Sequence, residues 1–415
     1  MNISSLPTEL LNLIVGHTTL QDLLSLSQTT RHIHAICLET IYCTVTLEDR
    51  ARALKCCSTI VSRQEASDSV REFKILCSPN DSDSDDPQSF EAVFTSAMIQ
   101  MKNLRVVHVH SRSLFELFSS MNFPRLSACT LPISLEIGSF LQSNPTVTSL
   151  VLQPGMEGPF PGLGSSPVQA IHLPRLRRFG GPAISTCSFI PGSCTSHITI
   201  FWTDSQGIGF PEGLQAAARS NNDIVDLGHF IDTWDHTLLP AIASHLPHIR
   251  TLQITKSKHI PELPLSRERF LASFDDALRS LTCLEALTVI TGADGTQGID
   301  DDALIAEGRL LQRWGEISPR LSIVSLPSNT LWIRARSSVW FPSKVSSDEH
   351  RSGAERQQWL LNEMFPNEAR IEVAAQAVKD FIADRAEMEA LRDTLNSMRL
   401  QLETTSAMSS WMGSM

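Results

Sequence analysis

The sequence predicts an α/β solenoid that begins with a small helical domain and ends with a single long helix. Three observations lead to this fold class. Leucines crowd residues 6–36 at helical spacing, and a short pattern, apolar-x-x-apolar-x-apolar, returns every 21 to 37 residues or so along the chain. An apolar stripe then runs through residues 367–403.

Length and composition limit the classes of protein that fit. The chain has 415 residues, 42% of them hydrophobic, and a formal net charge of -11, so we expect a sizeable core and no nucleic-acid partner. There is no run of 18 apolar residues and no signal-peptide pattern, which argues against a membrane span and against secretion. Nine cysteines without a C-x-x-C motif fit reduced thiols in the cytoplasm or the nucleus.

The N-terminal domain, predicted over residues 1–45, consists of two or three short helices. Its sequence from residue 6 is LPTELLNLIVGHTTLQDLLSLSQTTRHIHAI. Pro7 suits a helix start, Gly16 suits a helix end, and Asp22 is an acid in the first turn of the next helix. A hydrophobic face this small does not stabilise itself, so it must dock on the rest of the chain or on another protein.

This stretch resembles an F-box in the order and spacing of its Leu-Pro opening, its ELL..I and DLLSLSQT segments and the basic Arg31. One departure is Ile33, where many F-boxes carry tryptophan. The resemblance implies a surface that binds a Skp-family adaptor, formed by Leu6, Pro7, Leu10, Leu11, Ile14, Leu23 and Leu24.

The repeated pattern predicts one short strand per repeat. It appears as VREFKI, LRVVHV, LSACTL, VTSLVL, LRRFGG, HITIFW, IVDLGH, IRTLQI, LEALTV and LSIVSL. The last two apolar positions lie two apart and share one face of the strand. Helical periodicity at 90–101, 113–121, 270–281 and 303–317 predicts the return helices. Proline precedes several strands, where it ends a helix and favours extended backbone.

These repeats, predicted over residues 46–341, resemble irregular leucine-rich repeats. The asparagine that usually follows the strand in that family is missing, so a mixed α/β domain without solenoid stacking remains open. In the horseshoe interpretation, positions between the inward apolar pairs line a concave sheet face. The candidates for substrate binding there are His108, His110, Thr130, Val151, Gln253, Thr288 and Ser325.

Several segments interrupt or follow the repeats. We expect a disordered acidic loop at 78–89, an irregular insertion at 154–167, a linker at 342–366 and a disordered tail at 404–415. The helix at 367–403 either caps the last repeat, around Trp314, Leu321 and Trp332, or pairs with a second copy as a short coiled coil.

Catalytic signatures are missing from the sequence. It contains no P-loop, no G-x-S-x-G and no H-E-x-x-H. His108 and His110 share a strand face without a further metal ligand, Asp300 to Asp302 lack the spacing of a calcium loop, and Cys56–Cys57 have no evident base. We therefore predict no catalytic, cofactor-binding or metal-binding residues, and no cofactor.

The combination of an N-terminal F-box with irregular repeats, closing on RWGEISPRLSIVSLPSNTLWIR, is similar to a large group of fungal F-box proteins. The resemblance implies a non-catalytic substrate-recognition subunit of an SCF-type cullin–RING ubiquitin ligase, with a Skp-family adaptor, the cullin complex and an unknown target protein as partners. It also implies a cytoplasmic or nuclear location. A scaffold that recruits no substrate, and a hydrolase in an α/β domain, are the alternatives.

Overall fold

A computed structural model describes residues 6–77, 87–153, 171–202, 208–257, 269–291, 301–326, 328, 330–334, 340–344, 355, 359–360 and 363. The chain divides into two compact units, Met1–Thr195 and Ser196–Met415. The sequence predicted a single repeat domain, so this division is new. Each unit is described separately.

The first unit begins with three helices, α1 (Thr8–Gly16), α2 (Leu20–Leu26) and α3 (Arg31–Cys43). Two Thr-Thr pairs separate them. In each pair the first hydroxyl donates to a carbonyl at the end of the preceding helix, Thr18 to Val15 and Thr29 to Leu26. The second threonine caps the next helix, because its hydroxyl oxygen accepts the backbone N–H three residues later.

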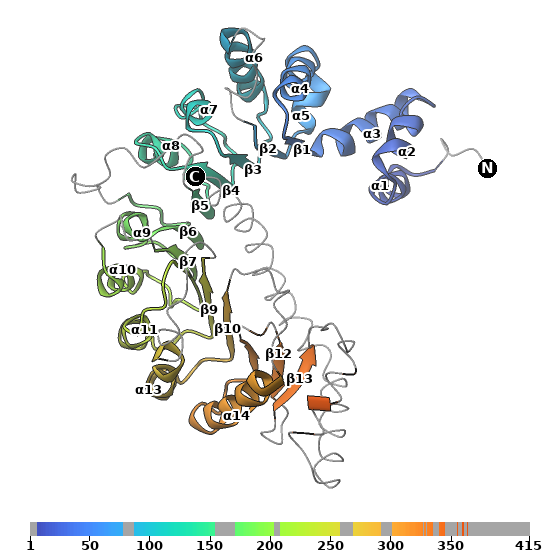
Figure 1. Ribbon diagram of the computed structural model, residues 1–415. Coiled ribbons are helices and arrows are strands. Elements are labelled where there is room, and N and C mark those ends of the chain that lie inside the picture. The colour runs from blue at the N-terminus through green and yellow to red at the C-terminus, as the bar shows by residue number, and fades with distance from the viewer. Residues whose placement is uncertain are drawn as a thin grey trace. The chain divides into compact units, whose positions relative to one another are not determined.

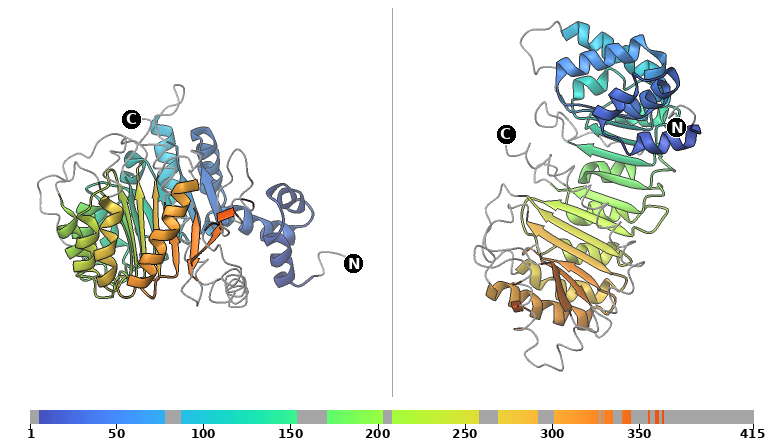
Figure 2. Two further views of the ribbon diagram at one scale, coloured as in Figure 1. Left: turned by 60° about the horizontal axis from the view of Figure 1, so that its bottom comes forward. Right: turned by 90° about the vertical axis from the view of Figure 1, so that its right-hand side faces the viewer.

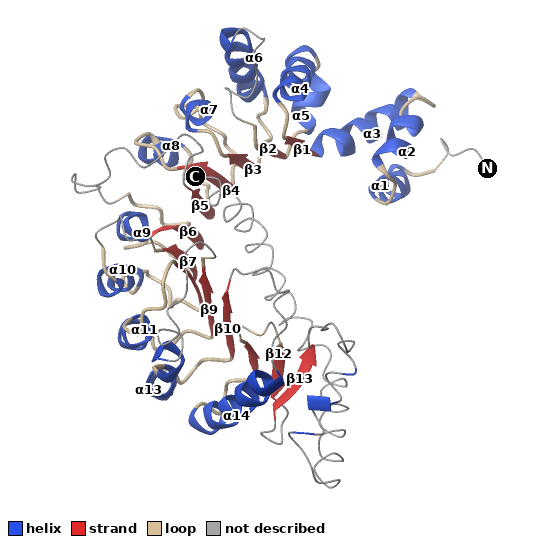
Figure 3. Cartoon of the chain, in the orientation of Figure 1, coloured by secondary structure: helices blue, strands red, loops and turns tan. Residues whose placement is uncertain are grey.

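A six-stranded parallel sheet, in chain order, makes up the rest of the first unit. Helices cover one face of it, and the opposite face, on which none of the described helices lies, is called the open face here (Figures 1 and 3). The strands are β1 (Thr44–Leu47), β2 (Glu72–Ile75), β3 (Val106–Val109), β4 (Ala128–Pro132), β5 (Ser149–Gln153) and β6 (Arg178–Pro182). The helices are α4 (Arg50–Ser62), α5 (Gln64–Ser69), α6 (Pro87–Gln100), α7 (Arg112–Glu116), α8 (Ile137–Ser143) and α9 (Ala183–Phe189).

The second unit repeats this arrangement and then changes strand direction. Strands β7 to β11 are parallel, whereas β12 and β13 continue the sheet antiparallel (Figure 2). The strands are β7 (His197–Phe201), β8 (Asp226–Ile231), β9 (Thr251–Lys256), β10 (Ala286–Thr291), β11 (Ile323–Ser325), β12 (Leu331–Arg334) and β13 (Trp340–Lys344). The helices are α10 (Phe210–Ala217), α11 (Leu238–His245), α13 (Phe274–Ser280) and α14 (Asp301–Ile317).

Parallel strands alternating with helices confirm the predicted α/β solenoid type of fold. All ten strands predicted from the repeated pattern are present, as β2 to β11. The pattern missed β1, β12 and β13. Helix α7 is shorter than predicted, and the sheet continues beyond β11 with the antiparallel β12. The predicted helix at 367–403, most of the acidic loop and the insertion at 154–167 lie outside the described residues.

Each of seven strands, β3 to β6 and β9 to β11, is preceded by the same β-turn, called the pre-strand turn here. In each, the first apolar residue of the repeat donates its N–H to the carbonyl three residues earlier; the seven donors are Leu104, Leu126, Val147, Leu176, Ile249, Leu284 and Leu321. Five of these turns carry proline at their second position: Pro124, Pro145, Pro174, Pro247 and Pro319. Proline favours that position because its ring fixes φ near the turn value. The repeated prolines therefore build turns.

A second regularity joins the repeats. In eight repeats one carbonyl accepts two consecutive N–H groups from the next repeat, and we call this series the carbonyl ladder. For example, the carbonyl of Arg105 accepts from Ser127 and Ala128 at 2.8 and 3.1 Å. The other acceptors of this kind are Arg71, Ser127 and Thr148 in the first unit, and Ser196, Val225, Arg250 and Glu285 in the second. The ladder fixes the register of each strand on its neighbour.

Between the sheet and the helices of the first unit lies an aromatic core. The rings of Phe94, Phe118 and Phe140 form a contact series, with centroids 6.1 and 5.9 Å apart. Phe73 from β2 contacts Phe94 at 6.2 Å. Contacts of this kind between a strand and the helix that follows hold the two layers together.

Asn144, which is 1% exposed, connects two successive repeats in the first unit. Its side-chain oxygen accepts the backbone N–H of Phe123 at 2.7 Å. Its amide nitrogen donates to the carbonyls of Met121 at 3.0 Å and Phe140 at 2.8 Å. One side chain therefore gives hydrogen-bond partners to three backbone groups, one of them in α8 and two in the segment before β4.

In the second unit, Trp202 donates its indole N–H to Nδ1 of His229 at 2.8 Å. His229 is fully buried on the core side of β8, and burial lowers its pKa to about 3. The imidazole is therefore neutral in the folded protein at neutral pH.

Replacing Asn144 with alanine should lower the free energy of unfolding by about 2–4 kcal/mol, because three backbone groups lose their partner in a buried place. Asn122→Ala, at an exposed position in the same segment, is the matched control and should change it by no more than about 0.5 kcal/mol. Urea unfolding measures both. Equal effects would contradict this role for Asn144.

Acid should destabilise the second unit through His229. The pKa is lower in the folded state than in the unfolded state, so the stability is fully present above about pH 6.5 and is lost as the pH falls toward 3. Between pH 7 and pH 5 the loss should be about 2 kcal/mol. The His229→Gln variant keeps a hydrogen-bond acceptor for Trp202. In urea unfolding, its loss of stability between pH 7 and pH 5 should be smaller than that of the unmodified chain by about 2 kcal/mol. His248→Gln, at an exposed position, should leave the pH dependence unchanged.

Candidate functional site

Exposed hydrophobic side chains concentrate on the first two helices. Seven large hydrophobic residues are exposed among those that the structure describes, and five of them belong to α1 and α2. These five, called the leucine surface here, are Leu10, Leu13, Ile14, Leu20 and Leu24. Leu13 and Leu20 are the most exposed of the five, at 60% and 61%. A cluster of this kind marks an interaction site.

The helical domain has its own core, separate from the leucine surface. Leu11, Val15 and Leu23 pack with Ile33, Ile36 and Cys37 from α3, and Leu6 is partly buried against this core. Leu11 and Leu23 are 2% and 5% exposed, and in this structure they hold the three helices together. Their part in an adaptor-binding surface stays a prediction. Ile33 fills the core place expected for the tryptophan of many F-boxes.

Two exposed leucines of the leucine surface, Leu13 and Leu20, are not among the residues predicted from the sequence to contact an adaptor. Helical spacing contained the signal for the first, because Leu10, Leu13 and Ile14 follow one another by three and four residues on one face. Leu11 and Val15, four apart, occupy the neighbouring face, which is the one that packs on α3.

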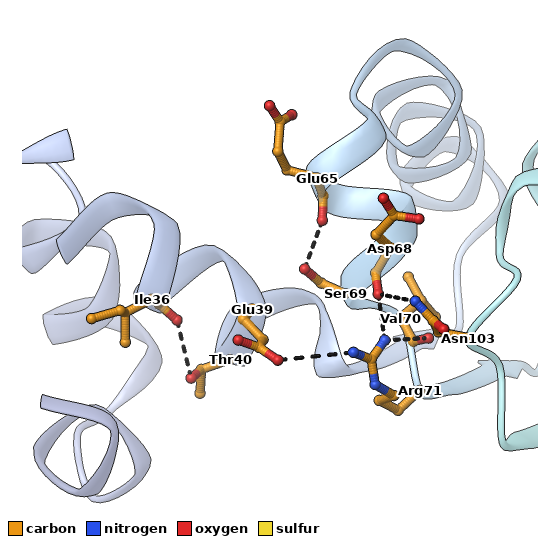
Figure 4. Close-up of polar contacts among 9 residues, drawn as sticks. All are labelled: Ile36, Glu39, Thr40, Glu65, Asp68, Ser69, Val70, Arg71 and Asn103. Carbon is orange, nitrogen blue, oxygen red and sulfur yellow. Dashed lines mark hydrogen bonds and ion pairs between the residues drawn. The ribbon is translucent and has the colours of Figure 1, made fainter. Parts of the chain in front are cut away.

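Helix α3 leads directly into the sheet. It ends at Cys43, β1 begins at Thr44, and the carbonyl of Cys43 accepts the N–H of Arg71 at 3.0 Å. The guanidinium of Arg71 lies 3.8 Å from the carboxylate of Glu39 and donates to the carbonyls of Asp68 and Val70 (Figure 4). Asn103, from the pre-strand turn of β3, also donates to the Asp68 carbonyl, at 2.9 Å. These contacts join the helical domain to the first repeats without a linker.

The candidate substrate residues lie on the open faces, in two register rows. In the first unit His108, Thr130 and Val151 are neighbours across β3, β4 and β5. In the second unit Gln253, Thr288 and Ser325 are neighbours across β9, β10 and β11.

Burial divides these candidates. Thr130 and Gln253 are buried, at 6% and 5% exposed, so they do not offer contacts to a partner in this structure. His108, His110, Val151, Thr288 and Ser325 are partly exposed. His110 follows the last residue of β3.

Glu72 organises the charges at the β1–β3 end of the open face. Its carboxylate lies 2.8 Å from Nζ of Lys74 and 3.7 Å from Nε2 of His108, and it accepts the Thr44 hydroxyl at 3.4 Å. Burial and nearby Lys74 lower the pKa of His108 to about 4 although Glu72 acts to raise it, and burial lowers the pKa of His110. Both imidazoles are therefore neutral at neutral pH.

Reactive groups were also searched in the described part of the chain. No group of three His, Cys, Asp or Glu residues there could hold a metal ion. Cys56 and Cys57 form no disulfide bond. Burial raises the pKa of the Cys57 thiol to about 12, which fits a packing role. Asp301 and Asp302 lie in the first turn of α14. None of the described helices combines the length and the apolar character needed to cross a membrane.

Comparison with known families identifies the helical domain. The F-box domain family matches residues 3–41, which contain α1, α2 and nearly all of α3. The chain thus has an F-box domain at its N-terminus, followed by a long region of parallel strands alternating with helices. The match does not extend to the repeats, and a comparison with curated proteins finds no match.

Substitutions should separate the core of the F-box from its surface. Leu11→Ala should lower the local stability of α1 to α3 by about 2–5 kcal/mol, because it leaves a cavity between the helices. Leu13→Ala should change it by no more than about 0.5 kcal/mol. Native-state hydrogen exchange of the amides in these helices measures both, and equal protection in the two variants would contradict the assignment.

Proposed function

We propose that the chain is a substrate-recognition subunit of an SCF-type cullin–RING ubiquitin ligase. The leucine surface of the F-box binds a Skp-family adaptor, and the repeats, which we interpret as irregular leucine-rich repeats, bind the target protein. The observation that carries the proposal is the exposure of five large hydrophobic side chains on two helices of a matched F-box domain.

Energetics support a protein partner for this surface. Leaving several leucines in water is unfavourable, and covering each apolar side chain contributes about 1.5–3 kcal/mol. The core of the domain uses Leu11, Val15 and Leu23, so the leucine surface is free for a second protein. Its apolar character favours a partner that offers a hydrophobic groove.

The mechanism proposed is proximity. Ubiquitin transfer takes place on other subunits, and this chain raises the effective concentration of target lysines near the conjugating enzyme. The direct connection of α3 to β1, with the contacts of Arg71, supports this role because it limits how far the bound target moves relative to the adaptor. Such complexes act in the cytoplasm and the nucleus.

Adaptor binding tests the proposal directly. A Leu13→Ala/Leu24→Ala double variant should weaken binding to a Skp-family adaptor by about 2 kcal/mol or more, a loss of roughly thirtyfold, because buried interface anchors contribute on this scale. Calorimetry on the purified full-length chain measures it.

The control is Ile99→Ala/Leu135→Ala, which removes two exposed hydrophobic residues outside the F-box. This variant should bind the adaptor like the unmodified chain. Equal affinity of both double variants would reject the leucine surface as the adaptor site. Stabilisation of target proteins in cells that lack the chain would then separate a substrate receptor from a scaffold.

A further inference from the structure

The turns that lead into β3 to β6 carry an unusual charge. None of the four segments 101–106, 121–128, 143–149 and 173–179 contains aspartate or glutamate, and all except 143–149 contain lysine or arginine. The whole chain, in contrast, has 45 acidic and 34 basic residues. The basic residues, called the basic strip here, are Lys102, Arg105, Arg125, Arg175, Arg177 and Arg178.

All six side chains of the basic strip are exposed. None of them forms a salt bridge or a side-chain hydrogen bond with another residue of the described part of the chain. Arg71, one repeat earlier, contacts Glu39, and Arg279 and Arg313 of the second unit contact aspartates. The basic strip is therefore a set of cations whose charge is not neutralised by side chains of the residues that the structure describes.

The carbonyl ladder fixes where two of these side chains originate. The successive ladder positions, each immediately before one of the strands β3 to β6, are occupied by Arg105, Ser127, Thr148 and Arg177. Neighbouring strands are about 4.8 Å apart, so the backbones of Arg105 and Arg177 are separated by roughly 14 Å. Arg125 and Arg175 occupy the third position of their pre-strand turns, at the same edge of the sheet. The separation of roughly 14 Å between the backbones of Arg105 and Arg177 equals about four residues of an extended peptide, at roughly 3.3 Å per residue.

The equivalent segments of the second unit differ. Asp223 precedes β8, Asp226 begins β8, and Glu285 precedes β10. These acidic residues alternate along the sheet with Arg250, before β9, and Arg320, before β11. The basic strip is thus a property of the first unit and does not follow from the repeat itself.

Exposed aromatic residues, on which the bases of single-stranded nucleic acids stack, are missing from the four segments: Phe123 and Phe179 are buried. Guanidinium groups bind carboxylates with two parallel hydrogen bonds, which suits glutamate and aspartate side chains. The pattern fits an acidic peptide better than RNA or DNA.

We infer that the basic strip binds an extended Asp/Glu-rich segment of the target protein. This inference rests on the proposed function, because it assigns to the first unit a chemical class of target. Two acidic side chains about four residues apart in the peptide contact Arg105 and Arg177. Further positive charge along the same edge comes from Lys102, Arg125, Arg175 and Arg178. The binding is sensitive to salt because the strip is exposed.

Fluorescence anisotropy tests the inference with the full-length chain and a labelled peptide of alternating glutamate and aspartate, ten residues long. Arg105→Glu/Arg177→Glu/Arg178→Glu should weaken binding at least about tenfold, and raising the salt from 50 to 200 mM should weaken binding to the unmodified chain. The lysine triple variant at the same positions should lose much less, since it keeps the charge.

Arg219→Glu/Arg250→Glu/Arg320→Glu, which reverses three exposed arginines of the second unit, is the matched control and should bind normally. Equal weakening in both glutamate triple variants, or tighter binding of a ten-nucleotide single-stranded RNA than of the peptide, would overturn the inference. Adaptor binding of the strip variant should stay unchanged. If strip-dependent peptide binding occurs in a chain that does not bind the adaptor, the strip is supported and the proposed function fails.

Discussion

The carbonyl ladder is the constraint on which the repeat structure depends. In eight repeats, four in each unit, one backbone carbonyl accepts two N–H groups from the next repeat. Because the acceptor and both donors are backbone groups, the arrangement holds for arginine, serine, threonine, valine or glutamate at the acceptor position. The side chains at that edge are therefore free to vary, while the register of the strands is not.

Fixed register also separates the two faces of each sheet. With the ladder in place, Val107, Cys129 and Leu150 fall on the helix side, and His108, Thr130 and Val151 on the open side. The connecting segments contribute to neither the ladder nor the pre-strand turn. They differ in length between repeats, from short α7 to long α14, without disturbing the sheet.

This separation explains which features could be predicted from the sequence. The ten strands were predicted because each buries two residues two positions apart, and seven of them also follow the pre-strand turn. Thr44 to Leu47 lack a pre-strand turn, since β1 follows α3 directly, and β12 and β13 are antiparallel, so the pattern could not find them. In the F-box, leucine spacing showed an apolar region but not which leucines pack on α3. Which leucines are buried depends on how α1 and α2 pack on α3, and this packing places Leu11 and Leu23 in the core of the domain.

The same packing explains why the F-box presents leucine at all. Three short helices enclose a core with room for one apolar stripe of α1, and Leu11 and Val15 fill it. Leu10, Leu13 and Ile14 then form a second stripe that has no place inside the domain. The sheet does not provide one, because α3 is the helix that contacts α5 and β1. The second stripe therefore adds nothing to the stability of the chain alone, and its free energy of burial is available only for binding a partner.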